Sequence, residues 1–121
     1  MKKLLFLLFL FGCVTPTLPS FPPNGVLKKG VTVIEYSTTW CPACIEMHPI
    51  LAKLEKQMGF KRIMIDADDK WRPEYINYHQ SITTKWVPVV SIFVNGRLFY
   101  HGGWPGEEEF VWLLNDVMEK K

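Results

Sequence analysis

The hydrophobic residues of this chain change their spacing along its length, which predicts alternating strands and helices. Residues 31 to 36 are mostly β-branched and aromatic and lie between Gly30 and three hydroxyl residues, a pattern typical of a strand. From Pro42 the spacing becomes helical as far as Gly59, with Pro49 expected to kink the helix. The apolar positions predicted on or near one face of this helix, the face expected to pack, are Ile45, Leu51, Leu54 and Met58.

The next stretch predicts a second strand, a short helix and a hairpin. Residues 60 to 65 are expected to form a buried strand ending at Asp66, and residues 73 to 80 a short helix. Residues 89 to 94 are almost continuously apolar, and the Asn95-Gly96 turn after them predicts antiparallel pairing with residues 97 to 101.

A terminal helix completes the predicted order. Acidic residues 107 to 109 favour a helix N-terminus, and apolar residues recur behind them at helical spacing. The chain has 121 residues, which leaves room for one domain. We therefore expect an α/β fold, a central mixed sheet flanked by helices, over residues 26 to 121. The apolar positions of the last helix are Phe110, Leu113, Leu114, Val117 and Met118.

The first thirteen residues resemble an export signal, with Lys2 and Lys3 before an apolar run. Leu10-Phe11-Gly12-Cys13 resembles the lipobox of bacterial lipoproteins, in which the cysteine is acylated and becomes the mature N-terminus. Ordinary cleavage nearby is the alternative. The proline-rich residues 14 to 25 predict an extended tether. We expect an exported protein, in the bacterial periplasm or at the outer face of a membrane, anchored through Cys13.

Charge argues against a nucleic-acid partner. All twelve acidic residues lie beyond residue 13, and removing Lys2 and Lys3 from the fourteen basic residues leaves twelve, so the mature domain is neutral. A nucleic-acid-binding domain would show a basic patch or stripe.

Beyond Cys13 the chain has two cysteines, in Trp40-Cys41-Pro42-Ala43-Cys44. A disulfide closing so small a loop constrains little of the unfolded chain, so this spacing indicates chemistry or metal binding. Half of a zinc site is the alternative, with a further ligand from His48, His79 or His101. Because no second cysteine pair exists, we expect no metal. His48 is interpreted as a polar residue on the exposed helix face.

The order of these features resembles the thioredoxin family over residues 26 to 121. Cys41 and Cys44 match the redox pair, Pro49 the helix proline, Val87-Pro88 the cis-proline step and Asn95-Gly96 the hairpin turn. Glu35 stands where the family has a buried acid, usually Asp. The segment between Asp66 and Pro88 is longer than in a minimal thioredoxin, and there is little space before residue 31 for the family's first strand and helix.

Thiol–disulfide exchange needs a thiolate, and the two cysteines differ in position. Cys41 precedes the predicted helix, where unpaired N–H groups favour an anion, so it is predicted to be the nucleophile. Cys44, one turn further in, is predicted to be the buried resolving thiol. Strand alternation puts Glu35 beneath the cysteines if that face is core, where it is a candidate acceptor for the Cys44 proton. A solvated strand residue is the alternative.

The resemblance also implies a substrate groove. A cis Pro88 would place the backbone of Val87 beside the cysteines to pair with a substrate strand. Further groove residues are predicted from their positions, although core packing is as good an explanation for each tryptophan; they are Trp40, Trp86, Gly103 and Trp104.

Three functions fit these residues. The leading one is a disulfide reductase or exchange enzyme outside the cytoplasm, acting on protein disulfides and supplied by a membrane-side or periplasmic redox partner. The others are an oxidant of folding proteins and a non-catalytic binding module. No cofactor is expected beyond the redox-active Cys41–Cys44 disulfide.

Overall fold

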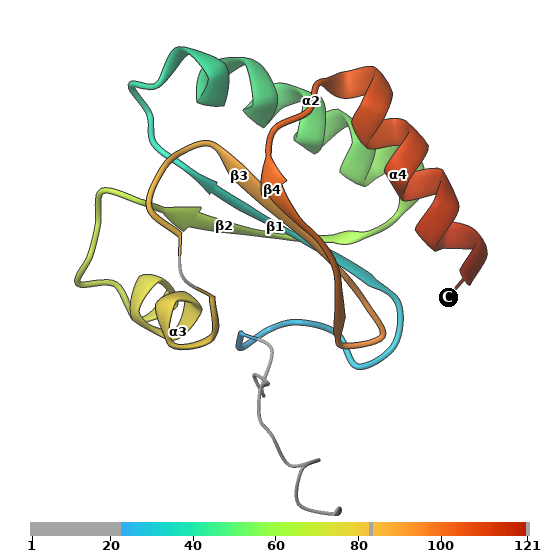
Figure 1. Ribbon diagram of the computed structural model, residues 1–121, viewed down its shortest axis with the longest axis horizontal. Helices are drawn as coiled ribbons and strands as arrows, with labels where there is room; N and C mark the ends of the chain where they lie inside the picture. The colour runs from blue at the N-terminus through green and yellow to red at the C-terminus, as the bar shows by residue number, and fades with distance from the viewer. Residues whose placement is uncertain (1–22, 83, 121) are drawn as a thin grey trace, which may run out of the picture.

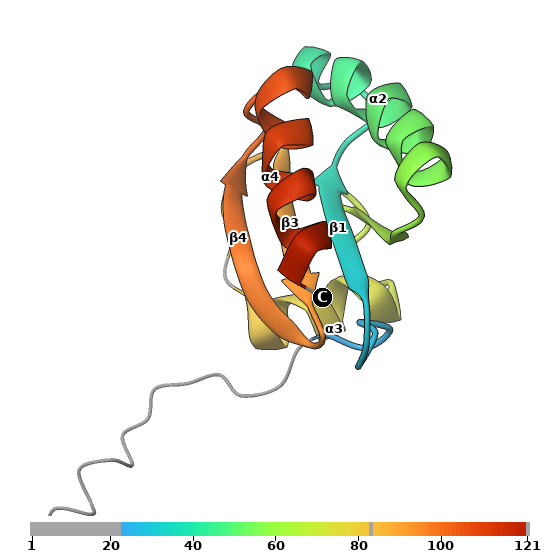
Figure 2. The same ribbon diagram turned by 90° about the vertical axis from the view of Figure 1, so that its right-hand side faces the viewer.

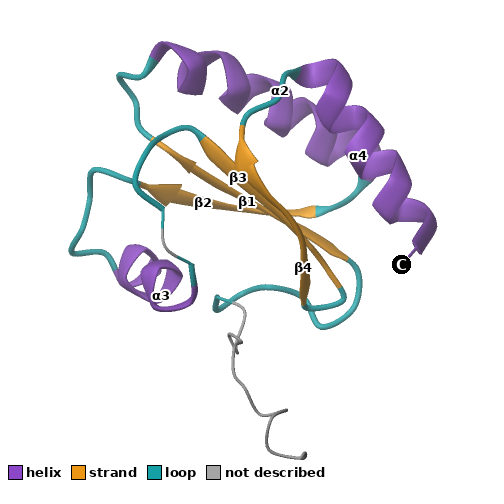
Figure 3. Ribbon diagram, in the orientation of Figure 1, coloured by secondary structure: helices purple, strands orange, loops and turns teal. Residues whose placement is uncertain are grey.

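The computed structural model describes residues 23–82 and 84–120. The predicted signal, Cys13 and most of the predicted tether therefore lie outside the described residues. The elements follow the predicted order of strands and helices (Figures 1 and 3). They are β1 (Val31–Ser37), α2 (Pro42–Met58), β2 (Lys61–Asp66), α3 (Pro73–Ser81), β3 (Val89–Val94), β4 (Arg97–Gly103) and α4 (Glu107–Lys120).

The strands form one mixed sheet in the order β2-β1-β3-β4. β1 and β2 run parallel, whereas β3 is antiparallel to both β1 and β4. α2 and α4 cover one face of this sheet and α3 lies against the other (Figure 1). The predicted α/β class, with a mixed sheet between helices, is confirmed.

Alternation along β1 divides the core into two clusters. Val31 and Val33 point into the cluster shared with α2 and α4, and Ile34 and Tyr36 into the one shared with α3. Both sets are buried because β1 is a central strand with helices over both of its faces. Glu35 falls on the same face as Val33, as alternation predicts, and it is completely buried there.

Two predictions about burial are wrong. Ile45 is 57% exposed, and Met47 takes the buried position instead. The buried face of α2 runs through Cys44, Met47, Leu51 and Leu54, at intervals of three and four residues, and Ile45 lies one residue off that stripe.

The second wrong prediction concerns β2, which was expected to be buried. It lies at the edge of the sheet and pairs only with β1 within the described part of the chain. Ile65 is its one buried residue, and Met64 is half exposed. An apolar run alone does not distinguish an edge strand from a central one.

The register of the sheet brings separated segments together at one end of its strands. Tyr36 pairs with Val89, and Val89 in turn pairs with Gly103. At this end of the sheet lie the segments that follow β1, precede β3 and follow β4, and α2 also begins here (Figure 1).

The described chain begins at the opposite end of the domain. The blue segment at its start lies beside α3, away from the start of α2 (Figure 2). The backbone N–H of Asn24 donates to the Asn77 side chain of α3, and Lys61 at the start of β2 donates to the Gly25 carbonyl.

Candidate active site

Cys41 caps the N-terminus of α2 with its sulfur. The backbone N–H of Cys44 donates to the Cys41 sulfur at 3.2 Å, and Pro42 occupies the first turn, where its missing N–H leaves no helical bond unmade. Cys41 retains 7% exposure against 1% for Cys44. The sulfur of Cys41 is therefore the more accessible of the two, and it receives the donor that stabilises a thiolate.

The Cys44 thiol has the opposite environment. Burial, followed by its hydrogen bond with Cys41, raises its pKa, and Thr38 opposes this only in part. Cys44 therefore holds its proton at neutral pH, and a base must remove it before this sulfur can act as a nucleophile.

Glu35 is not a lone buried acid, because three side chains contact its carboxylate. Arg62 from β2 donates to Oε1 at 2.8 Å. Nδ1 of His48 lies 2.9 Å from Oε2, and the Ser37 hydroxyl donates to that same oxygen at 3.1 Å. His48, interpreted above as a polar residue on the exposed helix face, is partly exposed but also contacts the buried carboxylate. One side of its ring contacts Glu35, while 46% of the side chain is exposed.

Arg62 was missed by sequence analysis. Its side chain is only 13% exposed, and its Nε donates to Glu55 of α2 at 3.1 Å. Arg62 pairs with Val33 in the sheet register, which puts it on the face of β2 that adjoins the Glu35 face of β1. Arg62 is one of two adjacent basic residues at the start of β2, directly before its apolar residues, and a basic residue on the core face of a strand was the signal that could have identified it.

A cavity of about 490 Å³ opens beside these groups. Glu35, Cys44 and His48 all line it, together with residues from the ends of β1 and β2 and from the start of α3. Thr38, which is also buried, is in its wall as well. The cavity is large enough, and has enough polar groups in its wall, to admit water between the Cys44 thiol and the Glu35 carboxylate.

The predicted groove residues lie in or beside the segments at the end of the sheet where α2 begins, but their environments differ. The Val87–Pro88 peptide bond is cis, the form that the resemblance implies. Trp86 is 69% exposed, and Trp40 is also exposed, with its indole N–H donating to Asp68 at 2.7 Å.

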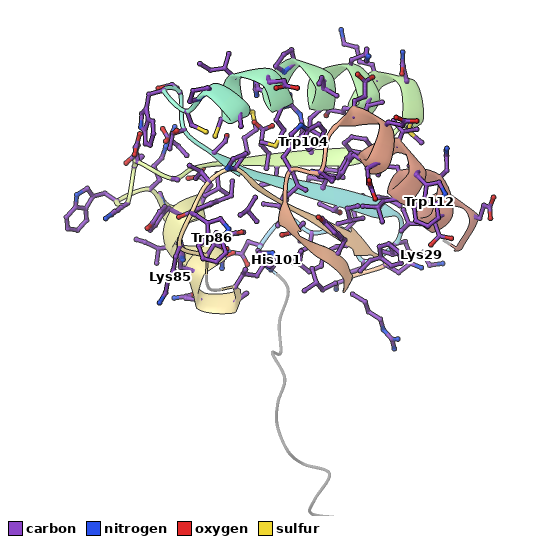
Figure 4. All side chains as sticks on the ribbon, turned by 45° about the horizontal axis from the view of Figure 1, so that its top comes forward. Lys29, Lys85, Trp86, His101, Trp104 and Trp112 are labelled. Carbon is purple, nitrogen blue, oxygen red and sulfur yellow. The ribbon has the colours of Figure 1, made fainter. Side chains whose placement is uncertain are left out.

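Trp104 is different, because its ring packs against Phe110 at 5.1 Å between centroids and contacts the α2–α4 core cluster. Figure 4 shows the side chains of Trp86 and Trp104 as labelled sticks. Core packing therefore explains the position of the Trp104 ring. The rings of Trp40 and Trp86 are exposed and accessible to a partner.

The three histidines lie in separate places. His79 contacts the Tyr36 hydroxyl at 2.9 Å, and His101 contacts the Ser91 hydroxyl at 2.8 Å. Among residues 23–82 and 84–120, no three His, Cys, Asp or Glu side chains are grouped so as to hold a metal ion.

Comparison with known proteins gives two short matches and many similar folds. No family model matches the chain. A thioredoxin of Mycoplasmopsis pulmonis is 38% identical over 32 residues, 26% of this chain and 29% of the relative. A thiol:disulfide interchange protein TxlA homolog of Synechocystis is 37% identical over 51 residues, 39% of this chain and 28% of the relative. The chain thus spans less than a third of the length of these relatives.

Among solved structures, Fasciola hepatica thioredoxin aligns with a TM-score of 0.63 at 15% identity, over 74% of this chain and 84% of that one. The fold is therefore thioredoxin-like. With the cysteine pair at the start of α2 and the two relatives above, the resemblance to the thioredoxin family is confirmed.

Proposed function

We propose that the protein is a thiol–disulfide oxidoreductase that reduces or exchanges protein disulfides through Cys41 and Cys44. The observation that carries this proposal is the division of labour between the two sulfurs. Cys41 is the helix cap, with a backbone donor on its sulfur, and Cys44 is the deeper thiol with a raised pKa. This arrangement suits attack by the first and resolution by the second.

The reaction has two exchange steps. The Cys41 thiolate attacks one sulfur of a substrate disulfide, which forms a mixed disulfide and releases the other substrate sulfur as a thiolate. Cys44 then loses its proton to a base, for which Glu35 is our candidate, and attacks the Cys41 sulfur. The second substrate thiolate leaves, and the products are a substrate dithiol and a Cys41–Cys44 disulfide. A redox partner must supply two electrons to restore the dithiol.

The direction of the reaction follows from the surroundings of Cys41. An oxidising protein of this kind stabilises its reduced form, chiefly the nucleophilic thiolate. Pro42 has no N–H and Ala43 has an apolar side chain, which leaves the Cys44 N–H as the donor to the Cys41 sulfur among the described contacts. So few donors favour a reductase over an oxidant of folding proteins.

Reduction of insulin by dithiothreitol tests this activity. We expect catalytic amounts of the protein to accelerate precipitation of the reduced insulin chains and Cys41→Ala to lose the acceleration entirely, since no other described thiol has a helix N-terminus to activate it. Equal rates with the wild type and with Cys41→Ala would contradict the proposal and favour a binding module.

We propose further that the protein is exported and held by a lipid on Cys13. The support is the lipobox-like sequence together with the position of the described chain's start, at the end of the domain away from the cysteines (Figure 2). An anchor there would leave Cys41 facing away from the membrane, toward other proteins. Within the described residues, no helix has the length and apolar character needed to cross a bilayer.

Mass spectrometry of the intact protein from its native membrane tests the anchor. We expect a mature N-terminus at Cys13 carrying covalent lipid, and release of the protein into the soluble fraction in a Cys13→Ser variant. A mature N-terminus elsewhere, without lipid, would contradict the anchor but not the redox activity.

A further inference from the structure

The contacts of Glu35 raise the question of how a completely buried carboxylate exchanges protons with water. Its side chain has no exposed surface. Of its three partners, Arg62 is a permanent cation and cannot accept a proton, and the Ser37 hydroxyl is a poor base. The imidazole of His48 is the remaining partner, and its two ring nitrogens can accept a proton on one side of the ring and release one from the other.

The position of His48 links the carboxylate to solvent. Nδ1 lies 2.9 Å from Oε2 of Glu35, while nearly half of the side chain is exposed. His48 also stands four residues after Cys44, on the same face of α2, and both residues line the cavity that Glu35 adjoins. The Cys44 thiol, the Glu35 carboxylate and the His48 imidazole are thus arranged from the core to the surface.

We infer that His48 is the group through which Glu35 passes the Cys44 proton to solvent, an inference that rests on the proposed thiol–disulfide exchange. The Cys44 proton moves to Glu35 through water in the cavity. It then moves from Oε2 to Nδ1 of His48, and the resulting imidazolium releases its Nε2 proton to bulk water. The Cys44 thiolate attacks Cys41, and the electron pair of the broken bond leaves on the substrate sulfur.

Arg62 holds the Glu35 carboxylate in an orientation that presents Oε2 to His48. Its Nη1 lies 3.5 Å from Nδ1 of His48. Arg62 also donates to Oε1, which leaves Oε2 as the oxygen that faces the imidazole. His48 therefore acts through Glu35, as a positioning and relay residue rather than by touching substrate.

Several other charged and titratable groups surround His48. Glu55 of α2 shares Arg62 with Glu35. The cavity that His48 lines also has charged residues from the end of β2 and the start of α3. Those residues are Asp66, Arg72 and Glu74.

Single-turnover kinetics tests the relay in the full chain. Reduced protein is mixed with insulin and quenched with acid, and mixed-disulfide formation and decay are followed separately on non-reducing gels. We expect His48→Ala to slow decay about tenfold, since general acid–base catalysis is typically worth 10²–10⁴-fold and solvent partly replaces a relay. Formation should be unchanged. Added imidazole should restore decay in His48→Ala.

Three further variants separate relay from structure. His48→Asn can still hydrogen-bond Glu35 but cannot carry a proton, so it should be as slow as His48→Ala. In a Glu35→Gln background, itself slow in decay, His48→Ala should add nothing. His101→Asn, which removes an imidazole bonded to Ser91 instead, should behave as wild type.

The possible outcomes test the His48 relay separately from the proposed thiol–disulfide exchange. A wild type that forms no mixed disulfide overturns the proposed function. Normal decay in His48→Ala, beside a wild type that does form the mixed disulfide, overturns the relay alone. Slow decay in His48→Ala that imidazole does not restore assigns His48 a structural role and also overturns the relay.

Discussion

Replacing Cys44 with alanine is expected to leave the protein covalently bound to its substrates. Cys41 keeps its place before α2, and Cys44→Ala retains the backbone N–H that donates to the Cys41 sulfur, so the first attack proceeds. The second step has no sulfur, and the mixed disulfide persists. Since Cys44 is 1% exposed, the smaller alanine also leaves the outer surface of the site unchanged.

Non-reducing gels of cells expressing each variant measure this trapping. Cys44→Ala should give a ladder of adducts that collapses with dithiothreitol, and Cys41→Ala, the matched control, should give almost none. The contrast should approach all or none because a buried thiol with a raised pKa makes a poor attacking group. Equal trapping by the two variants would contradict the assigned roles.

Replacing Arg62 with methionine is expected to be the most destabilising of the polar substitutions considered. The change leaves the Glu35 carboxylate in the core without its permanent cationic partner. Removing one member of a buried ion pair typically lowers the free energy of unfolding by about 3–5 kcal/mol. That is a large part of the roughly 5–15 kcal/mol that holds a domain folded.

Urea unfolding at neutral pH measures this effect. Arg72→Met is the matched control, because the Arg72 side chain is 59% exposed and its ion pair with Asp69 lies at the surface, where such pairs contribute little. Combining Glu35→Leu with Arg62→Met should recover much of the lost stability, since no unpaired buried charge remains. Equal losses for Arg62→Met and Arg72→Met would contradict the buried-pair interpretation.

Local patterns were sufficient to predict the order of elements. The β-branched residues 31 to 36, the Asn95-Gly96 turn and the acidic start of the last helix each specify structure through near neighbours. The errors arose where burial depends on more distant packing. Which face of α2 turns inward, and whether β2 lies at the edge, are set by the other elements of the fold.

The site was predictable only in part, for the same reason. The spacing of Cys41 and Cys44 predicts a redox pair, and strand alternation correctly predicted that Glu35 lies on the core face. The partners of Glu35 come from β2 and from the second turn of α2, and no sequence pattern specifies that Arg62 and His48 meet at one carboxylate. The register of β1 with β2 places Arg62 near Glu35, and the packing of α2 on the sheet brings His48 to the same carboxylate.

We propose that Cys41 and Cys44 form a reversible redox couple on the reducing side. Equilibrating the full chain in glutathione buffers, alkylating the free thiols and mapping the peptides by mass measures this directly. We predict a single two-electron transition in which these two sulfurs form an internal disulfide, at a potential nearer about −270 mV than about −120 mV. Cysteines that never form this disulfide, or a transition more oxidising than roughly −150 mV, would contradict the account.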